Sequence, residues 1–233
     1  MDRILVQPSF IPIYDALIKC RGILEWNIRC GLLDGLRSFS PELADDSEFI
    51  CKIITSSTAV IDYGYRSFQL LDAMPHYRKK SQGFKSLSDR SVQLKSCRNY
   101  LQHVRGDLQG GATVDFPVLG SVSWIDDGKC HAMALSQMTG QYSFGTIAYD
   151  TLDKKWAWNV MVSCKSHVVY PEEILSLIDS CIGEVREVVT IEGDPYKSGC
   201  LGSLQALYCN VISPNNSLAE QGAQLDAFGA VKL

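Results

Sequence analysis

The 233-residue chain has no long apolar run, and no stretch approaches the roughly 18 consecutive apolar residues of a membrane-spanning helix. The first residues, Met1 to Pro8, also lack the basic region and long apolar core of a secretory signal. Hydrophobic residues make up 46% of the chain and charged residues 21%, as in an ordinary globular protein. We therefore expect a protein without a membrane partner, located in the cytoplasm.

The chain also lacks the patterns of common metal and nucleotide sites. Its nine cysteines are scattered, none forms a Cys-x-x-Cys pair, and there are only four histidines. No phosphate-binding Gly-Lys-Ser/Thr loop, His-Glu-x-x-His or Gly-x-Ser-x-Gly motif is present. The cysteines are best interpreted as thiols of the core, and the sequence predicts neither a metal site nor a cofactor.

The net charge of −4 hides an uneven distribution. Eight basic residues and one acid, Asp89, lie between His76 and Arg105, which gives +7 there and leaves −11 for the rest of the chain. This basic stripe, residues 76–105, is typical of a surface that attracts phosphate, although it also fits a solvated helix face with acidic neighbours. From this stripe we expect Lys79, Lys80, Lys95 and Arg105 to contact RNA if the protein binds it.

Apolar residues recur at gaps of three, four and seven over Ile13–Leu36, a spacing that predicts an amphipathic helix. A second helix is predicted over Ser47–Ala73, where Asp45 and Asp46 are suitable capping residues. Two long helices joined by a short link favour antiparallel packing.

A third helix is predicted over Leu87–Leu108, with Ser86 or Ser88 as its cap. Pro171, followed by two glutamates, is a favourable start for another helix. Beyond it the pattern weakens, and Leu201–Val211 fits either a strand or a helix.

Between these helices the pattern changes to that of strands. Val118–Ile125 and Cys130–Met138 flank Asp126-Asp127-Gly128, a turn signal for a β-hairpin. A second hairpin is predicted from Tyr142–Asp150 and Lys155–Ser163, in which apolar residues alternate. His131 and His167 fall in these strands and are interpreted as structural. Core packing is preferred over a base-stacking platform for the three tryptophans of this region, Trp124, Trp156 and Trp158.

The expected fold is therefore mainly α: an antiparallel helical bundle with a small antiparallel β-meander inserted before the last helix. The predicted segments are a helical bundle over 1–113, a β insertion over 114–170, a bundle-completing helix over 171–195 and an uncertain C-terminal segment over 196–233.

One hexapeptide in the third helix, Arg98-Asn99-Tyr100-Leu101-Gln102-His103, has the character of a chemical site. Asn99 and His103 are four residues apart and share one helix face, while Arg98 lies about 140° from His103 and about 7.5 Å along the axis. Histidine can transfer protons near neutral pH, and arginine can hold a phosphate. Cleavage of RNA by its own 2′-hydroxyl needs a general base, a general acid and a cation. One hexapeptide has a single histidine, so two copies in a symmetric dimer would supply both proton-transfer groups and the cations.

Arg98-Asn99 followed by His103 resembles the signature of the HEPN superfamily, in which an arginine precedes a histidine by four to six intervening residues. The resemblance covers this motif and its helical surroundings, about Ile13–Ala112 plus the helix after Pro171, but not the strands. It implies an all-helical bundle, a homodimer with both motifs in one cleft, and a metal-independent endoribonuclease with Arg98 and His103 catalytic and Asn99 supporting. It further implies a role as a toxin or defence component with an antitoxin or regulatory partner.

Two other functions remain open. A non-catalytic HEPN-like module would bind RNA, a nucleotide or a protein without cutting. Alternatively, the bundle would only dimerise, and the strands around Trp156 and Trp158 would carry a surface for a protein partner.

Overall fold

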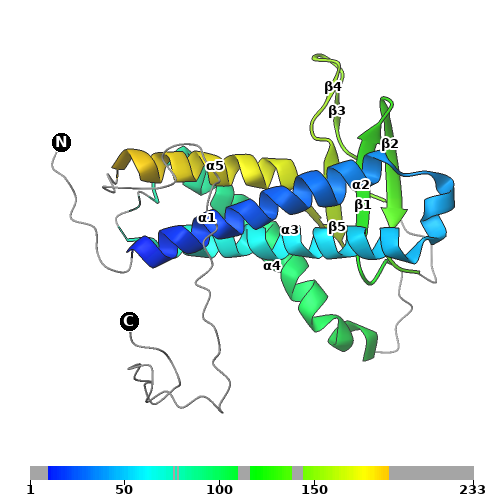
Figure 1. Ribbon diagram of the computed structural model, residues 1–233, viewed down its shortest axis with the longest axis horizontal. Coiled ribbons are helices and arrows are strands. Elements are labelled where there is room, and N and C mark those ends of the chain that lie inside the picture. The colour runs from blue at the N-terminus through cyan, green and yellow to red at the C-terminus, as the bar shows by residue number, and fades with distance from the viewer. Residues whose placement is uncertain (1–9, 76, 78, 110–115, 138–143, 189–233) are drawn as a thin grey trace, which may run out of the picture. The chain divides into compact units, whose positions relative to one another are not determined.

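The computed structural model (Figure 1) describes residues 10–75, 77, 79–109, 116–137 and 144–188. These residues belong to one compact unit, Met1–Asp194, whereas the second unit, Pro195–Leu233, lies outside the described residues. The prediction of a strand or helix over Leu201–Val211 therefore lies outside them as well.

The predicted first helix is a continuous helical segment, but it is not α-helical throughout. It consists of α1 (Phe10–Trp26), a π-helical stretch η1 (Asn27–Leu33) and the short α2 (Asp34–Arg37). At the start of η1 the Asn27 side-chain amide donates to the carbonyl of Ile23 at 2.8 Å. Wide π turns of this kind are rare and often occur at functional sites.

The second helix, α3 (Ser47–Ala73), has the predicted bounds and follows a short 3₁₀ turn, η2 (Pro41–Asp45). The Asp46 carboxylate caps it by accepting from the backbone N–H groups of Glu48 and Phe49, at 2.8 and 2.9 Å. This arrangement satisfies two of the N–H groups that a helix start leaves without partners.

The third helix, α4 (Gln82–Gln109), begins five residues earlier than predicted, so neither Ser86 nor Ser88 is its cap. Instead the Ser81 hydroxyl accepts from the backbone N–H of Phe84 at 3.1 Å. The physical reason is tertiary: Phe84 is buried and its ring stacks on Phe68 of α3, which draws the first turn of α4 into the bundle.

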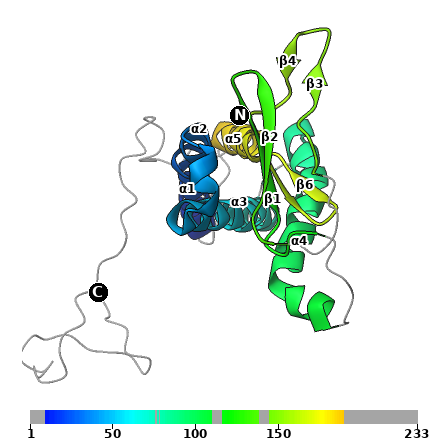
Figure 2. The same cartoon turned by 90° about the vertical axis from the view of Figure 1, so that its right-hand side faces the viewer.

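The last helix, α5 (Pro171–Val188), completes a bundle in which the order of packing is α1, α3, α4, α5 and back to α1 (Figure 2). Among the described residues, no helix combines the length and apolar character needed to cross a membrane. The bundle core is formed by apolar side chains that are fully buried, among them Leu17, Leu24, Ile28, Ile53, Val60, Ile61, Leu71, Leu87, Leu94 and Ile178.

Four strands form one antiparallel sheet in the order β2-β1-β5-β6: β1 (Ser121–Asp126), β2 (Lys129–Ala134), β5 (Val160–Cys164) and β6 (His167–Val169). The predicted turn between β1 and β2 is confirmed. Asp127 and Gly128 have φ angles of 44° and 71°, the left-handed conformation that two-residue hairpin turns require.

The predicted second hairpin is wrong over most of its length. Only β3 (Tyr149–Asp150) and β4 (Lys155–Trp156) pair with each other, and they form a separate two-stranded element. β5 pairs with β1 because its apolar residues are buried, and the Ser121 and Ser163 hydroxyls lie 2.6 Å apart across the two strands. β6 begins at His167, so the prediction that His167 lies in a strand is confirmed, although no bounds were predicted for that strand.

The sheet lies at the end of the bundle where α1–α2 ends and α5 begins, and it packs on α4 and α5 (Figure 1). Trp124 is buried there against Phe39, with ring centroids 5.2 Å apart, so its predicted role in core packing is confirmed. Trp156 and Trp158 are only half-buried, and Trp156 packs on Tyr149 in the β3–β4 hairpin, which projects from the sheet (Figures 1 and 2). The mainly α fold with an antiparallel sheet before the last helix is thus confirmed.

Candidate functional site

The hexapeptide lies in the C-terminal part of α4, which extends beyond the bundle (Figures 1 and 2). Cys97 and Tyr100 are buried and hold this part of the helix against its neighbours. Asn99 and His103 point away from the core and are exposed. The outer face of α4 consists of exposed side chains at helical spacing, namely Lys85, Asp89, Val92, Lys95, Asn99 and His103.

Arg98 lies at the boundary between α4 and α3 rather than on this outer face. Its Nε donates to the carboxylate of Asp62 on α3 at 2.7 Å, and each of the two side chains is 27% exposed. The guanidinium carbon stands 5.8 Å from the centre of the Tyr65 ring, at cation–π distance. Within the described part of the chain the two Nη groups of Arg98 have no hydrogen-bond partner, which leaves their N–H groups available to an anion.

Asp62 also holds a second arginine. Arg66, one turn further along α3, donates to the other carboxylate oxygen of Asp62 at 3.0 Å and lies over the ring of Tyr63 at 5.6 Å. One carboxylate therefore bridges two guanidinium groups from neighbouring helices. Sequence reasoning missed Asp62, Tyr65 and Arg66, although the spacing of Asp62 and Arg66 is that of an i, i+4 ion pair on a predicted helix.

The structure thus brings Arg98 together with α3, not with His103. Asn99 and His103 share the outer face, as helical geometry predicted, whereas the Arg98 side chain is directed at Asp62 of α3. Within the described part of the chain neither Asn99 nor His103 has a hydrogen-bond or ion-pair partner, so both can contact a ligand or a second protein. Counting the described residues, one copy of the chain presents one histidine here, His103.

Those of the predicted RNA-binding side chains that the structure describes lie on two different segments. Lys95 is exposed on the outer face beside Asn99, whereas Lys79 and Lys80 lie in the turn before α4. Lys79 is paired with Asp72 at 2.9 Å, and this removes part of the positive charge that the sequence suggested. The side chain of Arg105 lies outside the described residues, although its backbone is helical.

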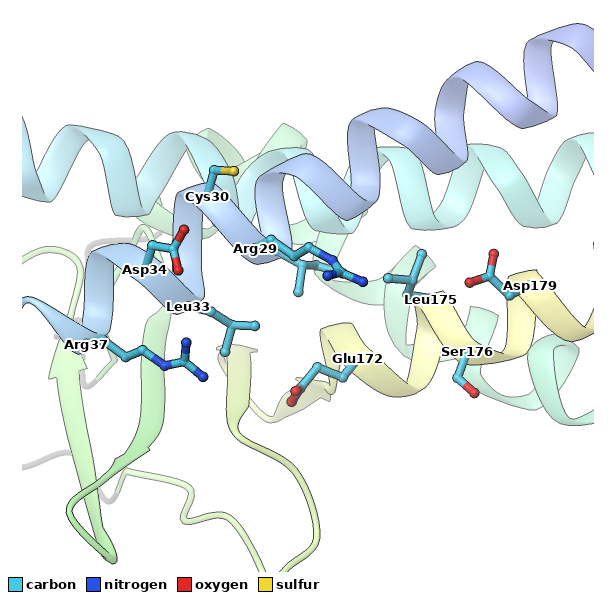
Figure 3. A pocket seen from close by; sticks show the side chains of 10 residues that line it. Arg29, Cys30, Leu33, Asp34, Arg37, Glu172, Leu175, Ser176 and Asp179 are labelled. Carbon is cyan, nitrogen blue, oxygen red and sulfur yellow. The ribbon is translucent and has the colours of Figure 1, made fainter. Parts of the chain in front are cut away.

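A cleft of about 700 Å³ lies elsewhere, between η1–α2 and α5 (Figure 3). Arg29, Leu33 and Arg37 reach into it from one wall, and Glu172 and Asp179 line the other. Both of these carboxylates already have partners: Asp179 accepts from Arg21 at 2.7 and 3.0 Å, and Glu172 accepts from the backbone and side chain of Asn159 at 2.7 Å. Neither wall includes a residue of α3 or α4, so this cleft is separate from the hexapeptide, and the sequence did not predict it.

Three cysteines, Cys97, Cys164 and Cys181, are buried as the sequence suggested, whereas Cys30 and Cys51 are exposed. A hydrogen bond with Cys97, together with burial, raises the pKa of the Cys164 thiol. Burial likewise raises the pKa of Cys181. Because the thiolate is the reactive form, these buried thiols are interpreted as packing residues. Among the described residues no group of three or more potential metal ligands is found.

The chain was also compared with known proteins. No protein-family model, curated protein or solved structure matches it.

Proposed function

We propose that the protein is a HEPN-like endoribonuclease that acts as a homodimer and needs no metal ion. The observation that supports this proposal is the arrangement around Arg98: Asp62 fixes its Nε, its Nη groups remain available, and Asn99 and His103 are exposed on the adjoining face. A fixed guanidinium and an exposed histidine on the same helix suit the charge stabilisation and the proton transfers of phosphodiester cleavage.

In the proposed reaction the 2′-hydroxyl of a ribose attacks the adjacent phosphorus, and the bond to the 5′-oxygen of the next nucleotide breaks. One histidine takes the proton of the 2′-hydroxyl, and the other gives a proton to the departing 5′-oxygen. The products are a 2′,3′-cyclic phosphate and a 5′-hydroxyl. Arg98 stabilises the negative charge that develops on the phosphate oxygens, and Asn99 orients the phosphate.

The need for two histidines is the reason for proposing a dimer, because His103 is the only histidine that each chain presents at this site among the residues that the structure describes. A two-fold axis beside the outer face of α4 would place two copies of His103 in one cleft. The C-terminal part of α4 extends beyond the bundle (Figures 1 and 2), and the side chains of Asn99 and His103 are exposed. By the same resemblance, we propose a toxin or defence role with an antitoxin or regulatory partner. Apart from that resemblance, we propose a location in the cytoplasm.

A second candidate is a non-catalytic HEPN-like module that binds RNA, a nucleotide or a protein. The observation that favours it is the Arg98–Asp62 ion pair, since a paired arginine offers less charge to a phosphate than an unpaired one. In that case binding would depend on exposed cations such as Lys80 and Lys95 and would not need His103.

The two candidates are separated by incubating the pure protein with a structured RNA in EDTA. The enzyme gives fragments with 2′,3′-cyclic phosphate ends, and His103→Ala cleaves at least about 100-fold more slowly because acid–base catalysis is lost. Gln102→Ala, at the neighbouring exposed position, is the matched control and retains activity. Binding without cleavage by the wild type would favour the non-catalytic module.

A further inference from the structure

The ion pair that fixes Arg98 extends to a second cation on the next helix. Arg66 and Arg98 donate to different oxygens of the same carboxylate, that of Asp62, at 3.0 and 2.7 Å. The two guanidinium groups therefore lie on either side of the Asp62 carboxylate, on a surface formed jointly by α3 and α4. Arg66 is 51% exposed, so this surface is open to a ligand.

The balance of charge distinguishes this cluster from the other arginine pairs of the described residues. Arg21 and Arg29 also share a carboxylate, that of Glu25, but Arg21 contacts Asp179 as well, so that cluster is neutral. Arg90 contacts one carboxylate, Glu173. Around Asp62, by contrast, two guanidinium groups share a single carboxylate and leave a net charge of +1. Arginines fixed in this way are well suited to a phosphate, because their N–H groups are already oriented before the ligand arrives.

The surroundings indicate which part of a nucleic acid would bind. The rings of Tyr63 and Tyr65 lie beneath Arg66 and Arg98, at 5.6 and 5.8 Å, so each ring already has a cation against it. Guanidinium N–H donors bind phosphate oxygens and do not distinguish one base from another.

We propose that Arg66, held beside Arg98 by the shared Asp62, forms a subsite for the phosphodiester group that neighbours the cleaved one in single-stranded RNA. Asp62 is the positioning residue that holds both arginines. The strand then runs from Arg66 on α3, past Arg98, to Asn99 and His103 on the outer face of α4. The subsite rests on the proposed function and adds to it a second cation and a substrate recognised through its backbone.

The subsite is tested by RNA binding alone, in a His103→Ala background that prevents cleavage. A fluorescein-labelled 12-nucleotide oligouridylate is titrated at several salt concentrations, with Arg66→Gln compared with its parent. The logarithm of the RNA-binding constant falls linearly with the logarithm of the salt concentration, and the loss of one phosphate contact makes this slope less steep by about 0.7 for a single strand. An oligoadenylate shows the same change, and Arg66→Lys retains the slope because it keeps the charge.

The matched control is Arg29→Gln, since Arg29 is also exposed and also paired with an acid four residues earlier, Glu25. It leaves the slope unchanged. The subsite is contradicted if Arg66→Gln binds like its parent, if Arg29→Gln has the same effect, or if the parent does not bind RNA. Failure of the proposed function is a different result: the wild type binds RNA through Arg66 but does not cleave it.

Discussion

Arg98 and Asp62 are joined by a hydrogen bond of 2.7 Å from Nε to Oδ1, which fixes the arginine of the RNYLQH segment to the neighbouring helix. The two residues are 36 positions apart in the sequence, and both are partly buried. The contact makes Asp62 a residue that acts through Arg98 rather than on the substrate. This role gives a prediction in which binding and cleavage change in opposite directions.

Asp62→Asn is expected to retain RNA binding, or to tighten it, because the cluster gains one positive charge. Cleavage is expected to fall by about 10- to 100-fold, since Arg98 is no longer held in its orientation. Rates in EDTA and binding isotherms measured on the same preparations test both effects. Asp72→Asn, which removes the partner of Lys79 on the same helix, is the control and leaves cleavage unchanged. Equal cleavage by Asp62→Asn and the wild type would show that Arg98 needs no positioning.

The packing of η1 on α3 gives a prediction about stability. A methyl group at Gly31 would overlap the side chain of Ser56, whose Cβ would lie 2.6 Å away. Gly31→Ala is therefore expected to destabilise the fold by about 1–3 kcal/mol, as overpacking does. At Gly22, in the same helical segment, an added Cβ meets nothing within 4 Å, so Gly22→Ala is neutral or stabilises by up to about 1 kcal/mol.

Urea unfolding of the two glycine variants measures the difference directly. Similar midpoints for both would mean that η1 does not lie as close to α3 as the Gly31–Ser56 contact requires.

The buried thiol of Cys164 gives a prediction about pH. Its pKa is raised in the folded state by the hydrogen bond with Cys97 and by burial, so its contribution to stability is present below the pKa of an unfolded thiol and is lost as the pH rises above it. Above about pH 9 each such thiol lowers the free energy of unfolding by about 1.4 kcal/mol for every unit of pH.

Cys164→Ala removes one of these groups and is expected to show the shallower pH dependence, whatever its stability at neutral pH. Unfolding free energies between pH 8 and 10.5, measured under reducing conditions, give the two slopes. Cys51→Ala, at an exposed position, is the control. Identical slopes for Cys164→Ala and the wild type would contradict the burial of this thiol.

The local part of the fold could be predicted from the sequence. The bounds of α3, its cap at Asp46 and the turn at Asp127-Gly128 all depend on residues within a few positions of one another. The pairing of β5 with β1 could not be predicted, because it joins Ser121 to Ser163 across 42 residues and competes with the nearer hairpin partner. The early start of α4 depends likewise on Phe84 packing against Phe68.

The candidate site divides in the same way. Helical periodicity alone places Asn99 and His103 on one face and Arg98 to the side, and the structure has this arrangement. Asp62 and Arg66, in contrast, have the sequence pattern of an ordinary solvated ion pair. Only the packing of α3 against α4 brings their carboxylate and guanidinium groups to Arg98.

The most direct test of a dimeric, metal-independent ribonuclease is the rate of RNA cleavage in EDTA over a dilution series of the protein. The proposal predicts a cleavage rate per chain that rises with protein concentration and then levels off once nearly all chains are dimeric. The rate of His103→Ala stays at least about 100-fold lower at every concentration. No cleavage by the wild type at any concentration, or equal cleavage by His103→Ala, would contradict it.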